Sequence, residues 1–348
     1  MEPSRTEESQ QKSLILLLNT GNPKSSKKKD VAKFLKEFLM DKHVISIPKL
    51  FRYVLVKGII TPCRKKKSAK RYQRLEHICH NTMPLSHYMQ ELAQRLQEKI
   101  GRPVLAIPRY GLGEANDLKE RILTLTAGEE PCSITVVALF PQFTSSSAYA
   151  ALNYIIPLLK TLFPKTKLRQ TPPYYNHPQY IAALAQSIQP LSSSGHYVFS
   201  FHSIPLSHRK KDARFQRVSY IKQCQTTYKL LTERLGLAPE RCSMAFQSKM
   251  GHHRWESPYT EKLVFDLIAN GERSFVLIAP GFSCDCLETI DDLNYVLRGR
   301  MMSAGAKAIR YVPALNSSAY AVDFLEQLIS ETERANEKES GTSIAERC

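Results

Sequence analysis

Short apolar runs that end in turn residues recur along the chain. The first of them, Leu14–Leu18, is continuously apolar and is followed by the turn cluster Asn19–Pro23. Such a run is typical of a strand buried on both faces of a parallel sheet. The next segment, Asp30–Met40, has its apolar residues at helical spacing. This order of strand, turn and helix indicates the start of a βα unit.

The same alternation continues towards the end of the chain. Further strands are predicted at Val104–Ile107, Ser133–Leu139, Lys167–Gln170, His196–Phe201, Ser243–Phe246, Ser274–Ile278 and Ala308–Val312. Amphipathic segments between them predict helices at His87–Lys99, Pro178–Ile188, Gln223–Leu235, Glu261–Ala269 and Thr289–Met302. Strands that alternate with helices indicate an α/β fold, with parallel sheets covered by helices on both faces.

A short internal similarity divides this pattern into two halves. Val137–Thr144 resembles Leu277–Ser283 in the order strand, proline, phenylalanine and hydroxyl residue. We therefore expect two similar Rossmann-like or flavodoxin-like lobes with a ligand cleft between them. The expected order is a disordered tail at 1–12, an N-terminal lobe at 13–160, a C-terminal lobe at 161–315, a helix at 316–332 that packs back on the first lobe, and a flexible tail at 333–348.

The loops after the predicted strands are the expected walls of this cleft, because ligands of open parallel sheets bind beyond the carboxyl ends of the strands. These loops are Asn19–Pro23, Arg109–Gly111, Pro141–Ser145, His202–Pro205, Gln247–Ser248 and Gly281–Glu288. None of them contains the glycine-rich dinucleotide fingerprint or a phosphate-binding loop with its lysine. A nucleotide cofactor is therefore not expected.

His202 directly follows the predicted strand that ends at Phe201. A histidine in this place is suited to act as a general base near neutral pH or as a metal ligand. A structural histidine that caps the turn before Pro205 is an equally good interpretation of the position alone.

A group of carboxylates, Asp285, Glu288, Asp291 and Asp292, follows another predicted strand. In a helix, Glu288 and Asp292 lie four residues apart on one face. A row of carboxylates at a cleft would give a divalent cation a path to the site. The alternative is that an acidic residue near a helix start complements the helix dipole, and this applies best to Asp285.

Two other segments carry residues that suit ligands. Trp255, the only tryptophan, lies in a polar stretch and is either a loop anchor or a flat stacking surface. The nearby pair His252 and His253 is interpreted as an exposed loop rather than a metal site, because adjacent side chains point in different directions. The segment Asp41–Thr61 mixes apolar and basic residues. This mixture fits either a core helix or an amphipathic lip that touches lipid or a hydrophobic ligand.

The net charge of the chain limits the classes of binding partner but does not identify one. The chain of 348 residues has 49 Lys+Arg against 32 Asp+Glu, a formal net charge of +17. Solvated helix faces, a nucleic acid, an anionic small substrate and an anionic membrane surface all fit this charge. The sequence has no zinc-finger spacing and no RNA-binding aromatic motif, so a nucleic acid partner is not expected.

The apolar runs and the cysteines indicate in which cellular compartment the protein is expected. No apolar run approaches the roughly 20 residues of a transmembrane helix, and the polar start lacks the features of a secretory signal. We therefore expect a cytoplasmic protein, with peripheral membrane contact left open. The cysteines are scattered and form no Cys-x-x-Cys pair. A disulfide scaffold, a structural zinc site and a four-cysteine iron–sulfur cluster are therefore not expected.

A series of longer motifs is more specific than any of these single residues. The motifs are Lys33–Asp41, Ser68–Tyr72, Phe201–Pro205, Phe246–Ser248, Trp255–Thr260 and Pro280–Thr289. Their sequences and their order resemble those of the bacterial ferrochelatases, which insert ferrous iron into protoporphyrin IX to make protoheme. The resemblance runs from about Leu14 to Ile329, which is nearly the whole chain.

The resemblance implies roles for individual residues. His202 falls on the family's invariant histidine and Glu288 on its active-site glutamate. In the family this pair flanks the porphyrin centre and is implicated in binding the metal and in removing the pyrrole N–H protons, and we assign these implied roles to His202 and Glu288 jointly. Asp285 falls on a conserved acidic position, for which a structural role is implied. The residues placed at the porphyrin pocket are Thr20, Tyr72, Arg109, Tyr110 and Trp255, and the basic run Arg64–Arg71 lies where the family contacts the propionates.

The resemblance also implies the ligands. Protoporphyrin IX is a flat apolar macrocycle with two carboxylates, so apolar walls, aromatic side chains and cations at the rim are expected. Metal insertion removes two N–H protons, and a porphyrin bound in a distorted shape exposes its nitrogen lone pairs. Ferrous iron is then a substrate, and neither an organic cofactor nor an iron–sulfur cluster is expected.

Some positions depart from the family's motifs. The usual Asn-Leu-Gly-Thr-Pro is Asn-Thr-Gly-Asn-Pro at Asn19–Pro23, the usual Gly-Ser-Pro-Leu is Thr-Met-Pro-Leu at Thr82–Leu85, and the usual glycine after His202 is Ser203. Two alternatives to a protoporphyrin ferrochelatase are therefore kept. One is a chelatase with another metal or tetrapyrrole preference, including one that mainly removes metal. The other is a noncatalytic porphyrin or heme carrier.

Overall fold

The structure is a computed structural model that describes residues 13–345 apart from 190–194, 216 and 250–253. Side chains are described as far as residue 337. The tail expected at 1–12 and the pair His252 and His253 therefore lie outside the described residues.

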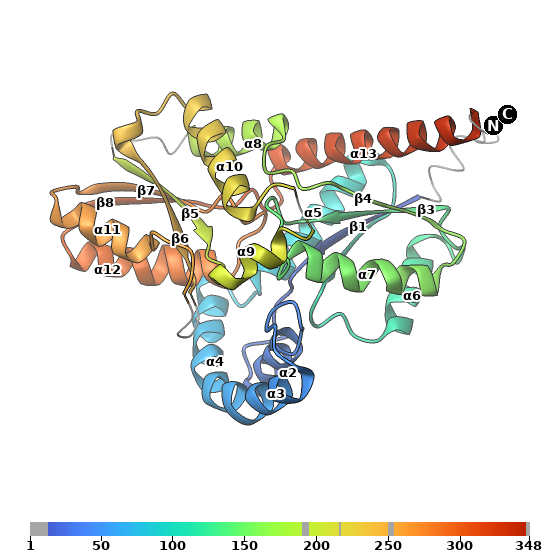
Figure 1. Cartoon of the computed structure of the whole chain (residues 1–348), viewed down its shortest axis with the longest axis horizontal. Coiled ribbons are helices and arrows are strands. Elements are labelled where there is room, and N and C mark those ends of the chain that lie inside the picture. The colour runs from blue at the N-terminus through green and yellow to red at the C-terminus, as the bar shows by residue number, and fades with distance from the viewer. Residues whose placement is uncertain (1–12, 190–194, 216, 250–253, 346–348) are drawn as a thin grey trace.

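The first lobe is built on a four-stranded parallel sheet (Figure 1). Its strands are β1 (Ser13–Asn19), β2 (Val104–Pro108), β3 (Ser133–Ala138) and β4 (Lys167–Gln170), in the spatial order β2-β1-β3-β4. The helices of this lobe are α5 (Pro84–Ile100), α6 (Ala115–Leu125) and α7 (Ala148–Leu162).

The central strand β1 explains how both faces of this sheet are covered. Successive side chains of a strand point to opposite faces. Accordingly, Ile15 and Leu17 belong to one buried cluster that includes residues of α5. Leu14, Leu16 and Leu18 belong to a second cluster with residues of α6 and α7. The continuously apolar run is thus buried on both sides, as predicted.

The second lobe repeats the arrangement. Its strands are β5 (His196–His202), β6 (Cys242–Gln247), β7 (Ser274–Ile278) and β8 (Ala308–Val312). They form a parallel sheet in the order β6-β5-β7-β8, so in both lobes the first strand lies between the second and the third. The prediction of two similar α/β lobes is confirmed. The helices of this lobe are α9 (Leu206–Asp212), α10 (Tyr220–Arg234), the 3₁₀ turn η3 (Pro239–Arg241), α11 (Thr260–Ala269), the π-helix η4 (Leu287–Leu297) and α12 (Arg298–Ser303).

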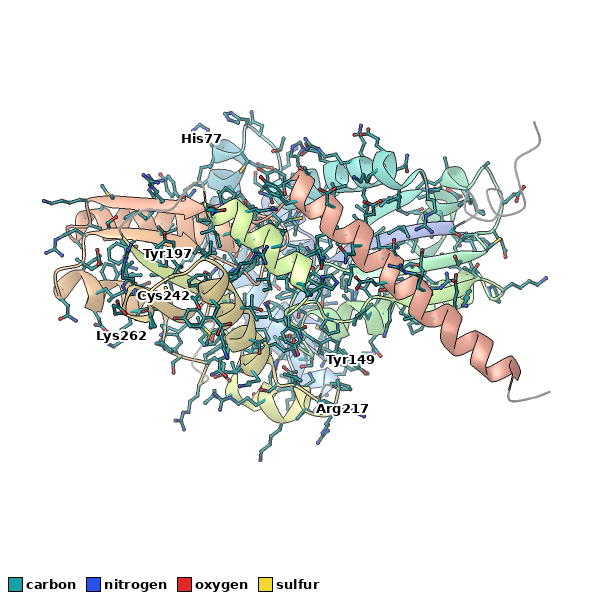
Figure 2. All side chains as sticks on the ribbon, turned by 90° about the horizontal axis from the view of Figure 1, so that it is seen from above. His77, Tyr149, Tyr197, Arg217, Cys242 and Lys262 are labelled. Carbon is teal, nitrogen blue, oxygen red and sulfur yellow. The ribbon has the colours of Figure 1, made fainter. Side chains whose placement is uncertain are left out.

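The connection between the lobes differs from the predicted boundary. The strand β4 pairs with β3 in the first sheet, so the first lobe extends at least to Gln170 rather than ending at 160. After β8 the chain returns through α13 (Ala319–Ala345), which contacts α5, β3 and β4 of the first lobe. Figure 2 shows α13 alongside α8 (Pro178–Ile188), with which it is also in contact. This helix continues well beyond the end predicted at 332.

A helical unit extends from the first lobe between β1 and β2, below both sheets in the view of Figure 1. It comprises α2 (Lys28–Leu39), α3 (Lys49–Tyr53), the π-helix η1 (Val54–Ile60) and α4 (Thr61–Ile78). The buried side chains of α4 include Ala69, Tyr72 and Leu75, which pack on Val31 of α2 and on Leu287 of η4. In this way α4 links the helical unit to the second lobe. Within the described part of the chain, no helix has the length and apolar character needed to cross a membrane.

Candidate active site between the lobes

A cavity of about 340 Å³ lies between the two lobes, on the side where the strands of both sheets end. Five of the six loops expected to form its walls contribute lining residues, and only the loop Arg109–Gly111 does not. The cavity wall is mostly apolar, and α2 and α4 of the helical unit complete it. The cavity therefore lies where the rule for ligands of open parallel sheets predicts a site.

His202 lines this cavity as the last residue of β5. Its Nδ1 lies 2.6 Å from the carbonyl oxygen of Ser203. Because a carbonyl only accepts, Nδ1 carries the proton, and Nε2 of the neutral ring is then the nitrogen with a free lone pair. The hydroxyl of Tyr220 donates to the carbonyl of His202 at 2.7 Å and fixes the backbone. His202 is thus oriented to accept a proton or bind a metal through Nε2.

Glu288 lines the same cavity from the first turn of η4. Its backbone carbonyl accepts from the side-chain amide of Gln247 at 3.0 Å. Gln247 is the register partner of His202 in the β5–β6 ladder, so one amide joins the two strand ends to the start of η4. Oε2 of Glu288 accepts from the thiol of Cys286 at 3.1 Å. The chain therefore places His202 and Glu288 around one cavity, which their sequence positions alone did not show.

Asp285 is buried and anchors the segment before η4. Its carboxylate accepts from the hydroxyl of Tyr311 at 2.5 Å and from the side-chain amide of Asn316 at 2.8 Å. Its own N–H donates to Oδ1 of Asn316 at 2.7 Å. Asp285 is not among the residues that line the cavity. These contacts fit the structural role implied for it.

The remaining carboxylates of the group join the two lobes. Asp291 is fully buried and accepts from Nε of Arg71 at 3.1 Å and from Nε of Arg74 at 2.5 Å. Arg71 also pairs with Asp292. Of these two aspartates only Asp292 lines the cavity beside Glu288. Burial raises the pKa of the Asp292 carboxyl to about 6, against the opposing effect of Arg71.

Three of the residues expected at the porphyrin pocket line the cavity: Thr20, Tyr72 and Trp255. Tyr72 is almost fully buried, and burial followed by the charge of Glu288 raises the pKa of its hydroxyl. The indole N–H of Trp255 is buried and has no hydrogen-bond partner among the described residues. A polar donor left unpaired at a cavity wall is available to a ligand.

Arg109 and Tyr110 are placed elsewhere, and the expectation that they line the pocket is corrected. Nη2 of Arg109 lies 2.8 Å from Oδ2 of Asp41, and the hydroxyl of Tyr110 donates to the same oxygen at 3.1 Å. The Arg109 guanidinium also stacks over the ring of Tyr154, 3.9 Å from its centroid. This pair therefore links the end of α2 to the segment that follows β2.

No preformed metal site is present among the described residues that line the cavity. Among the described residues, no cluster of three His, Cys, Asp or Glu side chains is placed to hold a metal ion. A structural metal site usually has about four protein ligands. A metal that is transferred to a product has to leave the protein, so a complete set of protein ligands is not expected for it. Among the residues that line the cavity, His202 and Glu288 offer an imidazole and a carboxylate, which are groups that can bind a divalent metal.

Sequence reasoning missed several residues that shape the site. The sequence indicates Gln247 only as part of a loop after a strand. Its position beside His202, and its hydrogen bond to the Glu288 carbonyl, depend on the strand register. The basic run Arg64–Arg71 is expected to contact propionates, and Arg71 of this run lines the cavity and also pairs with Asp291 and Asp292. The thiol of Cys286 was not given a role, although its position two residues before Glu288 was a usable signal.

The chain is similar to known proteins over most of its length. The Ferrochelatase family model matches residues 12–333. Ferrochelatase of Methylocella silvestris is 32% identical, with 91% of this chain and 92% of that protein covered. Ferrochelatase of Porphyromonas gingivalis is 33% identical, with 91% and 96% covered. Coproporphyrin III ferrochelatase of Streptococcus mutans is 33% identical, with 93% and 99% covered. The chain therefore belongs to the ferrochelatase family and is a metal chelatase that inserts metal into a porphyrin in heme biosynthesis.

Proposed function

We propose that this chelatase inserts Fe²⁺ into protoporphyrin IX, with His202 and Glu288 as the groups that act at the porphyrin centre. The observation that carries the proposal is their placement. Nε2 of His202 is the free acceptor of a ring fixed through Nδ1, and Glu288 enters the same cavity from η4. His202 is the last residue of β5, and Glu288 lies in the first turn of η4. Groups on regular elements can be positioned more precisely than groups on loops, as catalysis at the porphyrin centre requires.

The reaction follows from the charges involved. A free-base porphyrin carries two pyrrole N–H protons, and both must leave as Fe²⁺ binds to the four nitrogens. A neutral imidazole can take one proton, and a carboxylate can take or relay the other. The same two groups can hold Fe²⁺ before the porphyrin nitrogens replace them. We assign these steps to His202 and Glu288 jointly.

The carboxylates of the substrate have suitable partners among the residues that line the cavity. The hydroxyl of Ser248 and the indole N–H of Trp255 are buried and have no hydrogen-bond partner among the described residues. Lys249 also lines the cavity and brings a positive charge, and its Nζ lies 4.2 Å from the centroid of the Tyr259 ring. Two neutral donors and a cation suit a propionate, because hydrogen bonds to a charged acceptor are stronger than those between neutral groups.

Coproporphyrin III is the second candidate substrate, since a relative of similar identity is named for it. Coproporphyrin carries four carboxylates where protoporphyrin carries two. Among the described residues, Arg71 and Lys249 are the Lys and Arg side chains that line the cavity, and the carboxylates of Glu288 and Asp292 balance their two positive charges. This even balance favours the substrate with fewer negative charges.

The proposal is tested by giving the wild-type protein each porphyrin with Fe²⁺ under anaerobic conditions. Loss of free-porphyrin fluorescence and growth of the metalloporphyrin absorbance band report insertion. The expected result is a higher kcat/KM with protoporphyrin IX. A higher value with coproporphyrin III would reassign the substrate. Insertion of other divalent metals without insertion of Fe²⁺ would indicate a changed metal preference, and tight binding without insertion of any metal would contradict the proposal.

We also infer that the protein touches an anionic membrane surface through α3 and η1. Leu50, Phe51 and Val54 expose 72%, 68% and 57% of their surface, and Ile59 on the next turn is also exposed. The basic residues Arg64–Lys67 follow directly on α4. Exposed apolar side chains beside a cluster of cations are typical of interfacial binding to anionic lipid.

Membrane contact is tested by sedimentation with phosphatidylglycerol vesicles and with phosphatidylcholine vesicles. Binding is expected only to the anionic vesicles, and it should be lost in the double variant Leu50→Asp, Phe51→Asp. Met302→Asp is a matched control, because Met302 is 48% exposed on the other lobe. Equal binding of wild type and double variant would contradict the inference.

A further inference from the structure

Cys286 connects the start of η4 to the carboxylate of Glu288. Its thiol donates to Oε2 of Glu288 at 3.1 Å. The same sulfur accepts the backbone N–H of Thr289, and the backbone N–H of Cys286 donates to Oγ1 of Thr289 at 2.8 Å. This reciprocal pair is a capping box in which a cysteine takes the place usually held by serine or threonine. One side chain therefore both caps the helix and holds the carboxylate.

Among the described residues, the thiol is the group that donates a hydrogen bond to the Glu288 carboxylate. Gln247 fixes only the backbone carbonyl of Glu288. Within the described part of the chain, no group donates a hydrogen bond to the second carboxylate oxygen, Oε1. Both Cys286 and Glu288 line the cavity, so a carboxylate held through Oε2 can present Oε1 to a ligand. A glutamate side chain has several rotatable bonds, and the reaction is slower when no contact holds the carboxylate in its reactive orientation.

We propose that Cys286 is a positioning residue for metal insertion, whose thiol orients Glu288 so that Oε1 faces the porphyrin centre. The inference rests on the proposed function, because it assumes that Glu288 acts on the metal or on the pyrrole protons. A thiol is a weak donor. It therefore directs the carboxylate while withdrawing little of the negative charge that the reaction uses.

The test compares three variants of the full chain. Cys286→Ala removes the thiol donor and half of the cap, and kcat should fall about tenfold while KM for porphyrin stays unchanged, because a hydrogen bond to a charged group is lost. Cys286→Ser keeps both contacts and should stay within about threefold of the wild type. Thr289→Val removes the other half of the cap but leaves the thiol to hold Glu288. It should lower thermal stability as Cys286→Ala does and keep kcat within about threefold of the wild type.

The outcomes separate this inference from the proposed function. A wild type that binds porphyrin but inserts no metal would overturn both together. An active wild type with an equally active Cys286→Ala variant would overturn only the positioning role. The same conclusion would follow if Thr289→Val lost as much kcat as Cys286→Ala, since the effect would then belong to the helix cap. Loss in Cys286→Ala with recovery in Cys286→Ser supports the inference.

Discussion

At the scale of single residues, the site depends on contacts that the sequence can only partly reveal. The position of His202 after an apolar strand was enough to single it out. Its tautomer was not predictable, because the carbonyl that fixes Nδ1 belongs to Ser203 and its direction depends on the loop conformation. The meeting of His202 with Glu288 likewise depends on the register that sets Gln247 beside His202. The sequence thus indicated the position of His202 at a strand end but not the contacts that orient its side chain.

Asp292 gives a prediction about pH. Its carboxyl has a pKa of about 6 in the folded protein, raised from 3.8 mainly by burial. A raised folded pKa means that the folded state binds the proton more tightly than the unfolded state. The free energy of unfolding should therefore fall as pH rises from about 4 through about 6.

The measurement for Asp292 is urea unfolding at pH 5 and pH 7. The wild type should lose more stability over this interval than Asp292→Asn, in which the neutral amide removes the titration. Equal losses in the two proteins would show that Asp292 does not titrate in this range.

At the scale of elements, strands were predicted better than helices. The predicted runs Lys167–Gln170 and Ser274–Ile278 coincide with β4 and β7, because short apolar or alternating runs between turns have few other structures available. The helices α4 and α7 were not predicted. In α4 the charged residues Arg64–Lys67 interrupt the apolar periodicity, and α7 contains Pro157, which usually ends a helix. Packing on neighbouring elements overrides these local signals.

The turn between β1 and α2 gives a prediction about glycine. Gly21 has φ of +91°, and a Cβ added there would meet Cβ of Pro108 at 2.5 Å and the carbonyl oxygen of Tyr110 at 2.6 Å. Gly21→Ala should therefore cost about 2 kcal/mol or more in the free energy of unfolding, because both backbone strain and a clash are introduced.

Gly58 is the matched control for Gly21, because it lies in η1 with nothing within 4 Å of an added Cβ. Gly58→Ala should be neutral or stabilise the protein by up to about 1 kcal/mol, since alanine restricts the unfolded chain. Chemical denaturation of both variants checks the pair. Similar stability of Gly21→Ala and Gly58→Ala would contradict the account of the turn.

At the scale of the whole molecule, polar contacts hold the two lobes at a fixed distance around the cavity. Arg71 and Arg74 reach from the helical unit to Asp291 on η4. On another side, Nζ of Lys211 in α9 donates to the carbonyl of His43 at 3.1 Å and to Oγ of Ser46 at 2.9 Å. Such contacts join residues far apart in the chain. The sequence therefore predicted two lobes but not their boundary or how they are joined.

The ion pairs at Asp291 give a prediction about this joining. Asp291→Ala leaves two arginines without their buried partner and should lower the free energy of unfolding by about 2 kcal/mol, less than for a fully buried pair because both arginines are about one-third exposed. It should also weaken porphyrin binding, since α4 and η4 both line the cavity.

Asp266→Ala is the control for Asp291→Ala. It breaks an exposed pair with Lys262 and should change stability by less than about 0.5 kcal/mol. Thermal unfolding and porphyrin fluorescence titration measure both effects. Unchanged porphyrin affinity in Asp291→Ala would show that the bridge does not shape the cavity.

The central claim is that His202 and Glu288 act on the porphyrin centre rather than hold the porphyrin in place. The most direct measurement compares the wild type, His202→Ala and Glu288→Gln in anaerobic insertion of Fe²⁺ into protoporphyrin IX, with porphyrin affinity measured for each protein. Both variants should lose at least about a hundredfold in kcat and bind porphyrin within a few-fold of the wild type. The claim would be contradicted if either variant kept the kcat of the wild type. It would also be contradicted if weaker porphyrin binding explained the whole loss of activity.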